Sequence, residues 1–254
     1  MNEPCFWKFS ASSDELIALV FREDGTDRSI SYADLSRSAK RWSERLRGSA
    51  ELDTPLVALE FETSPEAIAA YLGALDLGFP VLVLEPGQFA GESSLEALYQ
   101  PEIILARRDG VFDARGTGVQ RNAPATHPDL RLLLSTSGST GDPKLVRLSH
   151  ANIASNASSI AGYLGLRPSD RAATTLPLFY SYGLSVLHSY LAAGASLALI
   201  SDPVTTPGLL GSGAGTGCDQ PRTCAIPDRG FGHRELCPHV AANPALCDAS
   251  GRAT

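Results

Sequence analysis

The stretch that decides the fold is Leu132-Leu-Leu-Ser-Thr-Ser-Gly-Ser-Thr-Gly-Asp-Pro-Lys144. It begins as an apolar strand and continues as a loop of glycine and hydroxyl residues that is closed by proline and lysine. Hydroxyl groups, a permissive glycine backbone and an ammonium group together favour an anion, and a polyphosphate is the natural guest. The residues predicted to bind phosphate are Thr136, Ser137, Gly138, Ser139, Thr140, Gly141 and Lys144.

Two other interpretations of this loop are weaker. The Walker pattern of P-loop kinases and GTPases requires GxxxxGK followed by Ser or Thr, and the spacing here differs from it. A flexible Gly/Ser linker is the second alternative, but linkers are not normally set between two apolar strand candidates, here 132–134 and 145–148.

Short apolar runs alternate with helical patterns on both sides of the loop. Apolar residues at steps of three and four predict a helix over 31–46, and Ser64 with Pro65 predicts the start of another that ends near Gly78. Further helices are predicted at 93–99, 149–164 and 184–193, and strands at 56–61, 81–84, 102–106, 132–134, 145–148, 173–178 and 196–200. This alternation predicts an α/β fold with parallel sheets covered by helices. The stretch 110–128 is predicted to be an irregular connection.

Charge and hydropathy exclude several classes of function. The formal net charge of −7 argues against a nucleic-acid partner, which would need a surplus of Lys and Arg or a basic stripe. No charged residue lies between Arg171 and Asp202, but proline, glycine and polar residues interrupt this stretch, so a buried helix and strand are favoured over a membrane span. The N-terminus lacks the pattern of a signal peptide, and a cytoplasmic location is the expectation.

The loop residues also carry a family resemblance. Residues 136–144 match [ST]-S-G-[ST]-T-G-x-P-K, so the chain resembles the adenylate-forming (AMP-binding) superfamily of acyl-CoA synthetases, luciferases and the adenylation domains of peptide synthetases. Residues 30–35, 72–86 and 176–183 resemble the family elements L-T-Y-x-E-L, L-x-A-x-x-A-G-x-x-x-V-P-L-D-P and L-P-L-F-H-x-x-G, in the family's order. The resemblance is acyl-CoA synthetase-like, and it covers the N-terminal portion of the family's fold.

What the resemblance implies is a two-step ligase reaction. A carboxylic acid attacks the α-phosphate of ATP to form an acyl adenylate, and a thiol then takes the acyl group. The thiol would belong to coenzyme A or to the phosphopantetheine of an acyl carrier protein. The loop residues would hold the ATP phosphates with Mg²⁺, and Tyr180, Tyr182 and Gly183 would lie at the substrate pocket. No metal-ligating residue and no catalytic residue is assigned.

Several positions depart from the family pattern. Leu145 follows the loop lysine where the family usually has Gly, Val83 replaces a Pro, and Tyr180 replaces the commoner His. The family's later Y-G-x-T-E and Y-x-T-G-D elements, whose acids bind Mg²⁺ and ribose, do not occur in these 254 residues. We therefore expect a truncated, inactive fragment. The alternatives are a non-catalytic nucleotide-binding or partner-binding remnant, or a fragment of a peptide-synthetase-type adenylation domain.

The chain changes character after residue 207. Four of the five cysteines, Cys218, Cys224, Cys237 and Cys247, lie in the segment 208–254. They do not form CxxC pairs, so a zinc site is disfavoured. The sequence predicts a partial AMP-binding domain at 1–207 and an irregular or disordered tail at 208–254, for which translation out of frame is the leading hypothesis.

Overall fold

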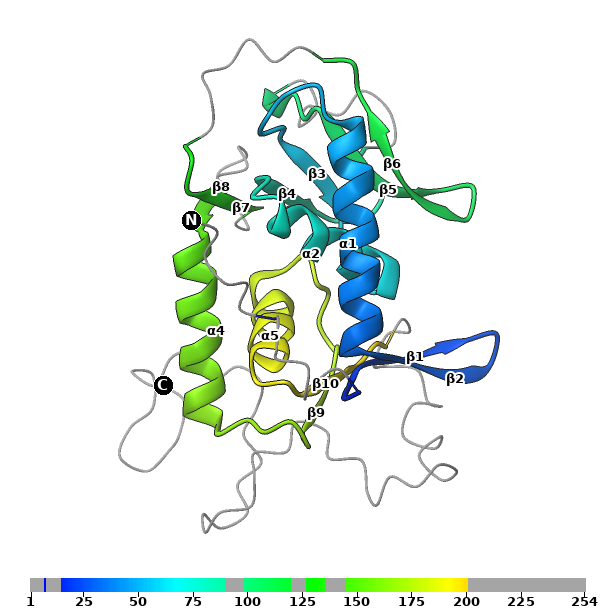
Figure 1. The fold of residues 1–254 in the computed structure, drawn as a ribbon, viewed down its shortest axis with the longest axis vertical. Coiled ribbons are helices and arrows are strands. Elements are labelled where there is room, and N and C mark those ends of the chain that lie inside the picture. Colours follow the sequence, from blue (N-terminus) through cyan, green and yellow to red (C-terminus); the bar gives the residue numbers. More distant parts are fainter. Residues whose placement is uncertain (1–6, 8–14, 90–97, 120–126, 136–144, 201–254) are drawn as a thin grey trace, which may run out of the picture. The chain divides into compact units, whose positions relative to one another are not determined.

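The computed structural model describes residues 7, 15–89, 98–119, 127–135 and 145–200, all within the compact unit Met1–Cys224. Its helices and two sheets are drawn in Figure 1. The helices are α1 (Tyr32–Ser49), α2 (Pro65–Asp76), α4 (His150–Leu164) and α5 (Ser181–Ala192). The strands are β1 (Ile17–Glu23), β2 (Thr26–Ser31), β3 (Val57–Glu60), β4 (Val81–Leu84), β5 (Ile103–Arg108), β6 (Val111–Gly116), β7 (Leu130–Ser135), β8 (Leu145–Ser149), β9 (Arg171–Ala173) and β10 (Ser196–Ala198).

The larger sheet has the strand order β6-β5-β3-β4-β7-β8, and its four central strands are parallel. Residues along these strands alternate between two apolar clusters, one on each face. In β4, for example, Val81 and Val83 join one cluster and Leu82 and Leu84 the other. Burial on both faces explains the continuous apolar runs of the sequence and confirms the predicted α/β fold class.

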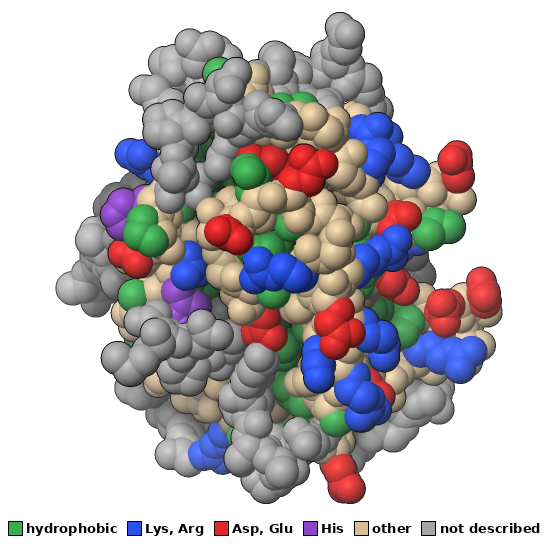
Figure 2. Space-filling model, turned by 45° about the horizontal axis from the view of Figure 1, so that its top comes forward, with side chains coloured by type: hydrophobic (Ala, Val, Ile, Leu, Met, Phe, Trp, Pro, Cys, Tyr) green, Lys and Arg blue, Asp and Glu red, His purple; other side chains and the backbone are tan. Residues whose placement is uncertain are grey.

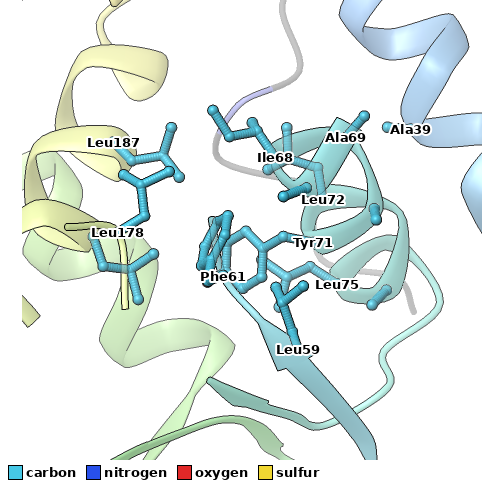
Figure 3. Close-up of a cluster of buried hydrophobic side chains, with 14 of the residues drawn as sticks. Ala39, Leu59, Phe61, Ile68, Ala69, Tyr71, Leu72, Leu75, Leu178 and Leu187 are labelled. Atoms are coloured by element: carbon cyan, nitrogen blue, oxygen red, sulfur yellow. The ribbon is translucent and has the colours of Figure 1, made fainter. Parts of the chain in front are cut away.

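Helices α1 and α2 pack together over one face of this sheet. The N-cap of α2 is Ser64, whose hydroxyl accepts a hydrogen bond from the amide of Ala67 at 3.2 Å, and Pro65 occupies the first turn as predicted. Nearly every side chain of α2 is buried, because it packs against α1, the sheet and the residues around α5. Figure 3 shows this core, with Phe61, Tyr71 and Leu72 facing Leu178 and Leu187.

The smaller sheet has the order β2-β1-β10-β9. It therefore combines the first two and the last two strands of the described chain. Strand β1 pairs in parallel with β10, about 180 residues later, through the register Leu19 with Leu197. The amide of Leu199 donates to the carbonyl oxygen of Val20 at 2.7 Å and extends the pairing beyond β10. Such a contact between distant segments cannot be read from local periodicity.

Two β-hairpins correct the sequence analysis. The predicted connection 110–128 contains β6, which pairs with β5 through a two-residue turn at Asp109 and Gly110. Asp24 and Gly25 make the same turn between β1 and β2, and all four residues have positive φ, as a type I′ turn requires. The Asp-Gly dipeptide was the signal that could have predicted both hairpins.

Other boundaries also shift. The strand predicted at 173–178 is wrong in position, because pairing with β10 places β9 at Arg171–Ala173 and Pro177 lies in the segment that leads to α5. Strand β8 is antiparallel to β7, since a nine-residue connection is too short for a parallel crossover. Most of the predicted helix 93–99 and the whole segment 208–254 lie outside the described residues. No described helix is long and apolar enough to cross a membrane.

Candidate functional site

The predicted phosphate loop is located by its two flanking residues. Thr136, Ser137, Gly138, Ser139, Thr140, Gly141 and Lys144 themselves lie outside the described residues. Ser135 is the last residue of β7, Leu145 is the first residue of β8, and the two are paired across the strands. The loop therefore leaves and re-enters the sheet at the carboxyl end of β7.

The carboxyl ends of the parallel strands share this edge of the sheet. Glu60 at the end of β3 pairs with Leu84 at the end of β4, and β4 is the neighbour of β7. In open α/β sheets, ligands bind in the crevice outside the carboxyl ends of the strands. The predicted loop thus follows a strand at the edge where the topology favours a binding site.

A cavity of about 610 Å³ lies at this edge, and we call it the cleft. Its wall is built by segments that follow strands of both sheets, and it combines apolar side chains with hydroxyl groups and one charged pair. The lining residues are Phe61, Glu62, Thr63, Ser64, Pro86, Arg107, Thr174, Thr175, Leu176, Pro177, Phe179 and Ile200. A cavity of this size and mixed lining is typical of a small-molecule site.

The charged pair of the cleft is Arg107 with Glu62. The Arg107 guanidinium donates to both carboxylate oxygens of Glu62, at 2.7 to 3.1 Å, and to the carbonyl oxygen of Gly110 at 2.7 Å. The hydrogen bonds to Glu62 raise the pKa of Arg107 above its ordinary value, so the guanidinium stays charged. The same two side chains, with Pro86, also line an adjoining cavity of about 150 Å³. The pair therefore forms a wall shared by both cavities.

The hydroxyl residues of the cleft are partly engaged by the backbone. Thr174 Oγ1 donates to the carbonyl oxygen of Ala198 at 3.3 Å and accepts from the amide of Ile200 at 3.0 Å. These bonds tie the ends of β9 and β10 together at the wall of the cleft. On the face drawn in Figure 2, acidic and basic side chains are interspersed.

The three predicted substrate-pocket residues lie at the start of α5. Tyr180 is 55% exposed and its ring lies 4.7 Å from that of Phe179, which lines the cleft. Tyr182 is half-buried, and Gly183 is buried against the carbonyl groups of Leu176 and Pro177. The structure thus brings these residues next to the cleft, while Leu176, Pro177 and Phe179 of the same segment form its wall.

Sequence analysis missed the charged pair of the cleft. Glu62 lies two residues after β3 and Arg107 lies near the end of β5, and a charged residue at the carboxyl end of a buried strand was the available signal. Val83, which replaces a Pro of the family pattern, is 1% exposed within β4, so the change affects packing. Among the described residues, no cluster of three or more His, Cys, Asp or Glu side chains could hold a metal ion.

Comparison with known proteins finds a family match for part of the chain. The AMP-binding enzyme family matches residues 95–211. Tyrocidine synthase 2 of Brevibacillus parabrevis is 28% identical over 78% of this chain, and 2-succinylbenzoate–CoA ligase of Bacillus pumilus is 25% identical over 73% of it. The chain spans only 6% and 41% of these two proteins.

Solved structures show the same fold. ATP-bound MatB from Rhodopseudomonas palustris superposes with a TM-score of 0.62 at 24% identity, covering 78% of this chain and 45% of MatB. VinN in complex with 3-methylaspartate superposes with a TM-score of 0.58 at 22% identity, covering 72% of this chain and 56% of VinN. The chain therefore spans about half the length of these structures.

Proposed function

We propose that this chain, whose residues 95–211 match the AMP-binding enzyme family, supplies the ATP polyphosphate site of an AMP-forming acid ligase. One observation carries the proposal. The segment with the phosphate-loop sequence connects Ser135 to Leu145 at the same sheet edge as the cleft. Polyphosphate and a second substrate would therefore meet at the carboxyl ends of β3, β4 and β7.

In the proposed first step, a carboxylate oxygen attacks the α-phosphorus of ATP. The bond from that phosphorus to the bridging oxygen breaks, and pyrophosphate leaves with the electron pair. Negative charge grows on the departing pyrophosphate, where the hydroxyl groups of the loop, its backbone amides and Lys144 would stabilise it. Their role is electrostatic, and none of them acts as a nucleophile.

Mg²⁺ would reach this site as the Mg·ATP complex. Magnesium usually keeps several waters and binds through substrate phosphates and few protein carboxylates. The described residues hold no acidic cluster suited to it, so we assign it no protein ligand and derive no step through it.

The acyl acceptor of the second step would be a thiol. The relatives include both a CoA ligase and peptide synthetases, so coenzyme A and a carrier-bound phosphopantetheine are both candidates. The acid would be a small carboxylic acid that occupies the region of Tyr180, Tyr182 and Gly183. This assignment rests on their position beside the cleft wall at the start of α5.

Titration of the 254-residue chain with Mg·ATP tests the proposal. We expect saturable binding, and Lys144→Ala should weaken it roughly tenfold or more, since one charge-assisted hydrogen bond contributes about 1.5–3 kcal/mol. Lys40→Ala is the matched control, because it removes the same charge from an exposed position on α1. Equal affinity of the two variants would refute the assignment of the loop.

ATP–pyrophosphate exchange with a panel of carboxylic acids separates the ligase from the non-catalytic alternative. We expect this chain to bind Mg·ATP without catalysing exchange, because the acidic residues of the family's later elements do not occur in its sequence. Exchange that depends on one added acid would overturn that expectation and would identify the substrate.

A further inference from the structure

A buried polar pair connects the two helices that begin at the cleft. Tyr71 Oη of α2 and His188 Nε2 of α5 lie 2.9 Å apart and share a hydrogen bond, although 117 residues separate them in the sequence. Their rings stack at 5.8 Å with an interplanar angle of 19°. Tyr71 is 0% and His188 4% exposed, in a core that is otherwise mostly apolar.

Burial keeps this pair neutral. Desolvation lowers the pKa of His188 to about 3 and raises the pKa of Tyr71 above its ordinary value. In a neutral imidazole one ring nitrogen donates and the other accepts. Either the Tyr71 hydroxyl therefore donates to Nε2, or Nε2–H donates to the hydroxyl oxygen, and both tautomers preserve the link.

The position of the pair relates it to the cleft. Helix α2 begins at Pro65, directly after the lining residues 61–64, and α5 begins at Ser181, shortly after the lining residues 174–177 and 179. Tyr71 and His188 each lie about two turns, or roughly 10 Å, along their helix from that end. The hydrogen bond thus joins two helices, and the segments that precede them, residues 61–64 and 174–179, form two parts of the lining of one cavity, which we call its two walls.

The two helices that carry the pair also contact residues that line the cleft. On the α2 side, the Tyr71 ring lies 5.1 Å from the ring of Phe61, which lines the cleft. On the α5 side, Gly183 packs so closely on the backbone of Leu176 and Pro177 that a Cβ atom would not fit. Figure 3 shows Phe61 and Tyr71 between α2 and the side chains from the α5 region.

We propose that the Tyr71–His188 pair is a positioning element that holds the two walls of the cleft in one relative arrangement. Apolar contacts alone tolerate sliding, because they have no directional preference. A hydrogen bond in a low-dielectric core is directional, and breaking it leaves a buried polar group unsatisfied. The pair therefore selects one register of α2 against α5, and with it one spacing of residues 61–64 from residues 174–179.

Amide hydrogen exchange without ligand tests this inference independently of the proposed function. The probes are three hydrogen-bonded amides at the two walls, those of Phe61, Thr174 and Tyr180. Tyr71→Phe keeps the ring and removes the hydroxyl, and we expect exchange at these amides to be roughly fivefold faster. His188→Leu should have the same effect, whereas His188→Gln, which retains a polar partner, should restore protection.

Ser43→Ala is the matched control. Ser43 Oγ donates to the carbonyl oxygen of Gly73 at 2.9 Å, so this variant removes a hydrogen bond to the opposite side of α2. It should leave exchange at the two walls unchanged. Faster exchange at the walls in Tyr71→Phe, with β5 and β6 unaffected, supports the inference. Unchanged walls, or an equal acceleration over the whole described chain, would overturn it, because a purely structural pair lowers global stability only.

Discussion

Gly183 has no room for an added methyl group. A Cβ atom built there would lie 2.9 Å from the carbonyl oxygen of Leu176, 2.9 Å from the carbonyl carbon of Pro177, and closer still to the Pro177 oxygen. All three are backbone atoms, so no side-chain rotation can relieve the clash. The chain must instead shift α5 away from the segment that lines the cleft.

The magnitude for Gly183→Ala follows from two opposing terms. Overpacking against backbone costs up to about 3 kcal/mol. Replacing glycine by alanine in a helix stabilises the folded state by at most about 1 kcal/mol. We expect a net loss of about 2 kcal/mol in the free energy of unfolding, which lowers the melting temperature by roughly 4–8 °C for a chain of this size.

The assay is equilibrium urea unfolding followed by circular dichroism, with Gly162→Ala as the control. Gly162 lies within α4, is exposed, and has no atom within 4 Å of the added Cβ. This control should be stabilised by about 0.5–1 kcal/mol. If Gly183→Ala unfolds at the same urea concentration as the wild type or a higher one, with an unchanged slope, the predicted steric clash does not exist.

Three further predictions concern the core, a helix cap and pH. Gly73→Ala should destabilise the chain by about 1–3 kcal/mol in urea unfolding, because its Cβ would lie 2.6 Å from the carbonyl oxygen of Ala39 in α1; an unchanged midpoint would contradict the close packing of α1 on α2. Ser149→Ala should cost about 1 kcal/mol in the same assay, since it removes the capping box of α4 with Asn152, and Ser149→Thr should retain most of the stability. Burial lowers the pKa of His188 from its ordinary value of 6.5 to about 3, so the unfolded chain binds the extra proton first and stability falls as pH drops from about 7 towards 3. Urea midpoints between pH 7 and 5, where most carboxylates stay ionised, should decline less steeply in His188→Gln, and parallel profiles would count against the buried neutral imidazole.

Local sequence patterns predicted most of the larger sheet. Apolar runs identified β3, β4, β5 and β7 because these strands are buried on both faces, and Ser64 with Pro65 marked the start of α2. Residues 136–144 predicted a phosphate loop and carried the family resemblance, and the AMP-binding enzyme family matches residues 95–211. All of these signals lie within a few neighbouring residues, so no knowledge of the tertiary structure is needed to read them.

Tertiary structure decided what the sequence could not. The pairing of β1 with β10, the cavity between the two sheets and the Tyr71–His188 hydrogen bond all join segments distant in the chain. His188 has no local signal, because an imidazole in an apolar helix looks the same whether it meets solvent, a ligand or a tyrosine. The sequence by itself determined the chemistry of the loop, whereas the arrangement of the two sheets decided which residues surround the cleft. Burial and hydrogen-bond partners are set by contacts across the fold.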